Sequence, residues 1–165
     1  MNRKKGGLRP LLRLMGKMSF ADEYWAYALI TAFVAMHKGL KPIKKGVPLV
    51  LFGPKGCGKT RISTAIKEAI GVGDIYGGVF CVDGMACGEL DATFQGDGTV
   101  AVFRDVCGNA CRLVEWLKTR PWNVTKDVII ETSDLRTLSR LMKLGLCVCV
   151  VFDGLPTDAK KGGAK

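Results

Sequence analysis

The sequence has little of several residue types that common functions need. His37 is the only histidine, which argues against a catalytic triad or a histidine-based metal centre. The longest apolar run, from Tyr24 to Met36, is shorter than the about 20 residues that span a bilayer, so we expect no stable membrane insertion. No acidic residue precedes Asp22, and this basic start has no apolar segment of signal-peptide length. Secretion is therefore not expected.

Positive charge is in excess. Lysine and arginine total 25 against 15 aspartate and glutamate, a formal charge of +10 on 165 residues. A chain of this length suits one domain, and a domain this basic favours a polyanionic partner such as nucleic acid or an anionic membrane surface. The seven cysteines are an odd number. We expect reduced thiols, with Cys147 and Cys149 on one face of a core strand.

Apolar patterning alternates between strands and helices. This order predicts an α/β fold, a three-layer sandwich with a mostly parallel five-stranded sheet and an N-terminal helical segment. We expect a flexible basic arm over 1–18, a helix capped by Ser19 and a basic loop within 19–46, a folded core over 47–154 and a disordered tail over 155–165. Strands are expected over 47–52, 79–83, 99–103, 127–132 and 146–152, and helices over 22–38, 60–70, 109–120 and 135–145.

The segment "LFGPKGCGKT" matches the phosphate-loop pattern G-x-x-x-x-G-K-[ST] without a mismatch. Glycines let backbone N–H groups curl around a phosphate at the start of a helix. Lys59 should reach the β- and γ-phosphates of ATP, and Thr60 should ligate Mg²⁺. The expected nucleotide-binding residues are Gly53, Pro54, Lys55, Gly56, Cys57, Gly58, Lys59, Thr60 and Arg61.

Acidic residues follow later strands. Asp105, after "TVAVFR", is the expected acid on the Mg²⁺ side, so Thr60 and Asp105 form the predicted metal site. "DVIIETSD" ends in a polar cluster that can hold the attacking water. Asp83 and Glu131 are the candidates for the acid that orients this water.

The order of these features resembles the superfamily 3 helicase domain of replication-initiator (Rep) proteins of small circular single-stranded DNA viruses. The resemblance covers about residues 47–153: the phosphate loop, "LDATFQGDGTVAVFRDV" as a Walker B region, "LVEWLKTRPWNVTK" as a B-prime turn, "VIIETSD" as motif C, and "RTLSRLMKLGLCVCVVF". Two positions depart from the family. Arg104 replaces the first of two Walker B acids, and Asp134 stands where motif C ends in Asn.

The resemblance implies a P-loop NTPase (AAA+-like) fold for the ATPase core over 47–154. It also implies an oligomeric ATPase, such as a hexameric ring, that moves or remodels single-stranded nucleic acid in the cytoplasm or nucleus of a host cell. Arg136 and Arg140 would be the arginines that act on a neighbouring subunit's site. In "RPWNVTK", Arg120, Trp122 and Lys126 combine a stacking ring with cations, as single-strand binders do. Two alternatives stay open: a small-molecule P-loop kinase, and a nucleotide-gated assembly protein with little turnover.

Overall fold

A computed structural model describes residues 7–37, 47–70, 100–107, 111–119, 127–145 and 147–160. From residue 47 to residue 151 the described strands and helices alternate, as the sequence predicts. In chain order the described elements are α1 (Leu8–Met15), α2 (Glu23–His37), β1 (Leu49–Phe52), α3 (Lys59–Ile70), β2 (Val100–Phe103), α5 (Cys111–Thr119), β3 (Asp127–Thr132), α6 (Leu135–Lys143), β4 (Val148–Val151) and α7 (Thr157–Lys160).

The described strands form one parallel sheet in the order β2-β3-β1-β4. β1 lies inside the sheet, with Leu51 opposite Glu131 of β3 on one side and Val150 of β4 on the other. The sheet therefore has four described strands where five were predicted. The fifth, over 79–83, lies outside the described residues.

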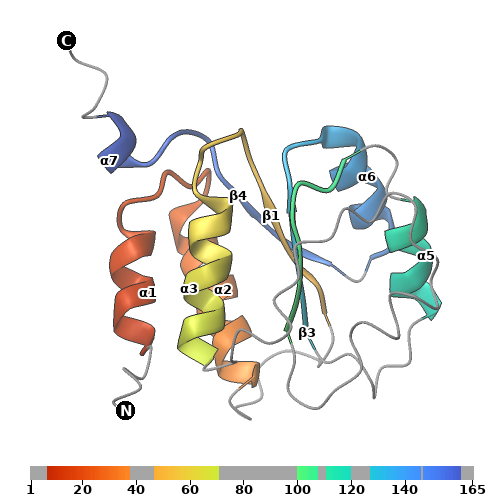
Figure 1. The fold of residues 1–165 in the computed structure, drawn as a ribbon, viewed down its shortest axis with the longest axis horizontal. Helices are drawn as coiled ribbons and strands as arrows, with labels where there is room; N and C mark the ends of the chain where they lie inside the picture. Colours follow the sequence, from red (N-terminus) through yellow and green to blue (C-terminus); the bar gives the residue numbers. More distant parts are fainter. Residues whose placement is uncertain are drawn as a thin grey trace.

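Helices cover both faces of the sheet, as Figure 1 shows. α1, α2 and α3 lie on one face, and α5 and α6 lie on the other. Each face has its own apolar cluster, because alternate residues of a strand point to opposite sides. Leu51 and Ile129 belong to the cluster under α1–α3, whereas Val50 and Ile130 belong to the cluster under α5 and α6. The α/β layered architecture is confirmed.

The second cluster is built around aromatic residues, and the two cysteines predicted to lie in the core pack against it. Trp116 of α5 is fully buried and meets Phe103 edge to face, with ring centroids 5.6 Å apart. Cys147 and Cys149 are half-buried and pack against the same cluster. Burial and the neighbouring Cys147 raise the pKa of the Cys149 thiol to about 11, so it stays protonated near neutral pH. Both cysteines are packing residues, as predicted.

Residues 8–15 differ from the predicted flexible arm. They form α1, whose Leu11 and Met15 are fully buried against the first cluster. Their spacing of four residues places both on one face of the helix, while Arg9 and Arg13 remain exposed. The high positive charge of this segment concealed an amphipathic helix, which packs beside α3 (Figure 1).

The start of α2 and the segment after β4 also depart from the predictions. Asp22, rather than Ser19, accepts the backbone hydrogen bond that opens α2, from Trp25 N at 2.9 Å. Ser19 instead donates to Asp153 at 2.6 Å. Residues 155–160 are not a disordered tail, since Pro156 is buried and α7 follows it.

Candidate nucleotide site

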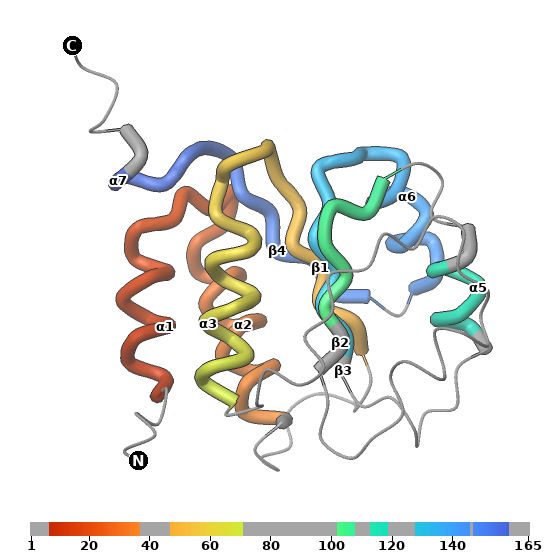
Figure 2. The backbone as a smooth tube through the Cα atoms, in the orientation of Figure 1, coloured from red at the N-terminus to blue at the C-terminus, as the bar shows by residue number. Residues whose placement is uncertain are grey.

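The phosphate loop lies at the carboxyl end of β1 and leads directly into α3. β1 has a parallel neighbour on each side, β3 and β4. After β1 the chain goes first to β2, which lies beyond β3, and only β4 at the end of the chain order lies on the opposite side of β1. Ligands of open α/β sheets bind at such a switch of strand order. Figure 2 shows this loop, the end of β2 and the link from β3 to α6 at the same end of the sheet.

Three glycines of the phosphate loop permit backbone angles or close contacts that a side chain would prevent. Gly56 and Gly58 have φ of 79° and 104°, which side chains other than glycine rarely adopt. A Cβ on Gly53 would lie 2.7 Å from the Cβ of Phe152, and one on Gly58 would overlap the sulfur of Met18. The loop is therefore compact, and residues from both ends of the described chain pack behind it.

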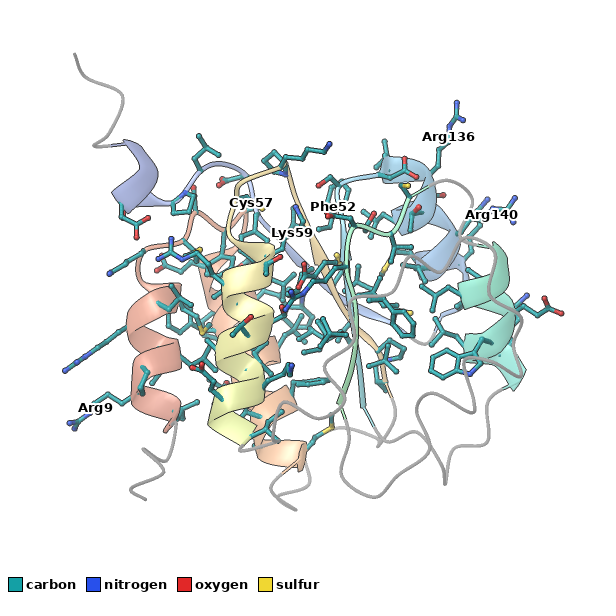
Figure 3. The ribbon with its side chains drawn as sticks, viewed as in Figure 1. Arg9, Phe52, Cys57, Lys59, Arg136 and Arg140 are labelled. Atoms are coloured by element: carbon teal, nitrogen blue, oxygen red, sulfur yellow. The ribbon has the colours of Figure 1, made fainter. Side chains whose placement is uncertain are left out.

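Lys59 is buried, and its ammonium points into the loop (Figure 3). It donates to the carbonyl oxygens of Gly53 at 2.9 Å and Pro54 at 3.0 Å, and to the hydroxyl of Ser133 at 2.9 Å. These three acceptors match the three N–H donors of an ammonium group. The buried Cys57 sulfur is a longer contact, at 3.6 Å. The lysine thus joins the loop to the residue that follows β3.

A buried carboxylate faces the first turn of α3. Glu131 is 1% exposed. Its Oε2 accepts a hydrogen bond of 2.8 Å from the Thr60 hydroxyl, and its Oε1 accepts one from the Ser63 hydroxyl. Both carboxylate oxygens therefore have donors, which burial of an acid requires. The arrangement follows from β3 lying next to β1, so that this acid extends beneath the start of α3.

Arg104 points to the same carboxylate. It follows β2, and its Nε lies 3.7 Å from Oε1 of Glu131. This Nε is buried without a hydrogen-bond partner, while Nη2 makes a long contact of 3.5 Å to the Thr64 hydroxyl. Arg104 stands where the Rep helicase family has its first Walker B acid. Here this position carries the cation of an ion pair. The acid of that pair comes from the neighbouring strand.

A cavity opens beside the loop. Asp105 follows Arg104 with φ of 50°, an uncommon value for a residue with a side chain, and its side chain is exposed. Asp105 faces the cavity together with Lys55 of the loop and with Asp134 and Arg136 at the start of α6. The cavity is lined by Lys55, Asp105, Val106, Cys107, Ser133, Asp134 and Arg136. Two acids and two cations thus lie within reach of one space at the edge of the loop.

Asp134 has a structural role in addition to facing this cavity. It caps α6, accepting from the backbone N–H groups of Arg136 and Thr137 at 3.3 Å each and from the Thr137 hydroxyl at 2.8 Å. The hydrogen bond from the Thr137 hydroxyl, helped by those backbone donors and by the charge of Arg136, lowers the pKa of Asp134. An ionised cap explains why aspartate suits the position where the family has asparagine.

Arg61, which was also predicted to bind the nucleotide, turns away from the site. Arg61 forms a bidentate ion pair with Asp158 of α7, at 2.9 and 3.1 Å. This hydrogen-bonded pairing raises the pKa of Arg61 and lowers the pKa of Asp158. Pro54, Lys55 and Gly56 are exposed on the loop surface.

The remaining predicted site residues divide into two groups. Arg136 and Arg140 are exposed on α6 and project outward in Figure 3. The predicted catalytic Asp83 and the predicted nucleic-acid contacts Arg120, Trp122 and Lys126 lie outside the described residues.

Sequence reasoning missed Ser63 and the direction in which Arg104 points. Ser63 lies three residues after Thr60, so both hydroxyls are on one face of α3, a helical spacing that could have indicated a shared partner. Arg104 had no such local signal, because its partner comes from a strand whose place in the sheet the sequence does not give.

Comparison with known proteins yields no match to a protein-family model and no matching curated protein.

Within the described ranges, no helix is long and apolar enough to cross a membrane. In the same ranges, no three His, Cys, Asp or Glu side chains gather as a metal cluster.

Proposed function

We propose that the protein binds Mg²⁺–ATP at the phosphate loop and hydrolyses it. The observation that carries this proposal is the hydrogen bond from Thr60 to the buried Glu131 carboxylate, directly beside the loop. The hydroxyl at this position of a phosphate loop is a magnesium ligand. Mg²⁺ is typically held by one or two protein oxygens, with phosphates and water completing the octahedron. Thr60 and Glu131 offer oxygens of that kind.

Two acidic residues have different roles in the proposed reaction. Glu131 assists magnesium, because it already contacts Thr60. Asp105, which lines the cavity at the edge of the loop, orients the attacking water. The roles expected from the sequence are thereby exchanged. Lys59, the backbone N–H groups of the loop and the nearby Lys55 would neutralise charge on the phosphates.

The reaction would serve an oligomeric machine that acts on single-stranded nucleic acid. The resemblance to viral Rep helicase domains and the charge of +10 support this choice. In such an assembly Arg136 or Arg140 would act on a neighbouring site, and specific activity would rise with protein concentration. One observation favours a second candidate, a nucleotide-gated assembly protein with little turnover: Arg104 occupies the place of a Walker B acid and pairs with Glu131.

Calorimetry with ATP, in excess Mg²⁺ and in EDTA, tests the assignment. We expect Mg²⁺ to strengthen ATP binding by the parent, and Glu131→Gln to remove at least tenfold of that gain, about 1.4 kcal/mol. Lys59→Ala should lose most of the affinity. The matched control is Glu68→Gln, which changes an exposed carboxylate of α3. This variant should bind Mg²⁺–ATP as the parent does.

Two results would contradict the proposal. Absence of ATP binding by the parent would remove the nucleotide function. Full magnesium dependence in Glu131→Gln would assign the metal to other residues. A phosphate-release assay then separates the two candidates, because the gated assembly protein would bind ATP without sustained turnover.

A further inference from the structure

We propose that α5 and α6 form a binding site for the phosphate backbone of single-stranded nucleic acid, separate from the nucleotide site. The site, here called the basic groove, is defined by Lys118 of α5 and by Arg136, Arg140 and Lys143 of α6. Its choice of ligand rests on the proposed function, but its binding reaction does not require ATP. The predicted contacts over 120–126 lie outside the described residues.

Two adjoining cavities make up the groove. One lies between the helices and is lined by Val114, Lys118, Arg140, Lys143 and Leu144. The other runs along α6 and is lined by Leu135, Arg136, Ser139, Arg140 and Lys143. Arg140 and Lys143 line both, so the two cavities share one wall of positive charge.

The cations form a row because of their spacing on the helix. Arg136, Arg140 and Lys143 follow one another by four and three residues, which places them on the same side of α6. At 1.5 Å per residue the row is about 10 Å long. This length suits contacts to more than one phosphate of an extended strand.

Helix stability explains this row only in part, because Arg140 and Lys143 favour the helix dipole in the last turn of α6, whereas Arg136 lies in the first turn, where positive charge is unfavourable. Like charges three and four residues apart destabilise a helix, and no acidic side chain is among the described residues that line the two cavities. Asp134, the N-terminal cap of α6, lines neither cavity. A polyanionic ligand would bring negative charge to this row of cations.

Apolar surface and shape favour nucleic acid over other anions. Leu135 and Met142 of α6 are 68% and 42% exposed, and Val114 and Leu144 line the inner cavity. These aliphatic side chains offer apolar surface for bases beside the cations that would hold their phosphates. A flat anionic bilayer would not reach into a cavity between two helices. An acidic polypeptide is the competing ligand and is distinguished by the test below.

The groove is also connected to the candidate nucleotide site. Arg136 lines both the outer groove cavity and the cavity beside the phosphate loop. It follows β3 by a few residues, and β3 carries Glu131. One strand and one helix therefore contribute to both sites.

Fluorescence anisotropy of a labelled 30-mer oligothymidylate, in EDTA and without nucleotide, measures the groove alone. The test variant is Lys118→Ala/Lys143→Ala. The matched control is Arg9→Ala/Arg13→Ala, which removes two exposed charges from α1, on the opposite side of the molecule (Figure 3). Each lost phosphate contact should flatten the plot of log affinity against log salt by about 0.7 and weaken binding about fivefold at 0.1 M salt.

We therefore expect the groove variant to lose about 25-fold in affinity at 0.1 M salt and about 1.4 in slope, and the control to bind as the parent does. Lys118→Arg/Lys143→Arg should retain the parent's binding. Circular dichroism verifies folding, and calorimetry should give the parent's Mg²⁺–ATP affinity for the groove variant. Failure of ATP binding by the parent would contradict the proposed function without affecting this assay.

Two outcomes would overturn the proposal. Equal loss in the groove and control variants would mean that the strand responds only to overall charge. Competition by polyglutamate as strong as that by unlabelled oligothymidylate of equal charge would assign the groove to an acidic polypeptide.

Discussion

The Thr60 hydroxyl donates a hydrogen bond of 2.8 Å to Glu131, a residue 71 positions away in the sequence. This contact joins the first turn of α3 to the end of β3 and places a buried acid at the phosphate loop. The same carboxylate has Arg104 at 3.7 Å on its other side. Glu131 therefore bears on both the stability of the fold and the proposed binding of Mg²⁺.

Arg104→Ala should destabilise the protein by about 1–2 kcal/mol, because it removes the cation beside a buried carboxylate. The expected loss is below that of a fully buried pair, since the arginine side chain is 24% exposed. Arg104→Ala/Glu131→Gln should recover part of the loss. Urea unfolding of the parent, both single variants and the double variant measures the coupling. Strictly additive losses would mean that the two side chains do not interact.

Asp105→Asn should reduce ATP turnover by at least 100-fold while Mg²⁺–ATP affinity stays near that of the parent. The reason is that a residue that orients water acts on the reaction step rather than on binding. Phosphate release and calorimetry provide the two measurements, with Glu68→Gln as control. A variant that loses affinity and turnover in proportion would instead place Asp105 on magnesium, as the sequence predicts.

The cap of α6 should make stability depend on pH. The pKa of Asp134 is lowered in the folded protein, so its ionised form stabilises the fold above the unfolded pKa of about 3.9, and this contribution disappears as pH falls through the lower folded value. Asp134→Asn keeps a capping oxygen without the charge. The difference in Tm between parent and variant should be present at pH 7 and shrink toward pH 2. A difference independent of pH would exclude the charge as its cause.

Leu11→Ala should cost about 2–5 kcal/mol, because it leaves a cavity where a fully buried side chain packs. Leu8→Ala is the control, since Leu8 is 39% exposed on the same helix. Urea unfolding compares the two. Equal and negligible effects would restore the interpretation of this segment as a flexible arm.

Local sequence signals were sufficient for much of this protein. The phosphate loop is a compact pattern, and β3 covers the predicted range 127–132. The contact between Thr60 and Glu131 was not predictable in the same way, because it depends on β3 lying beside β1 although β2 comes first in the chain. The charge of residues 1–18 also outweighed the spacing of Leu11 and Met15, which a helical pattern would have revealed.

The packing of Phe152 behind Gly53 has a consequence for the newly made chain. The phosphate loop leaves the ribosome about 100 residues before this partner, an interval of about 5–20 s at ordinary rates of synthesis. During that time the loop lacks the surface that supports its native shape. The proposed binding of ATP would therefore become possible only late in synthesis, when β4 joins the sheet.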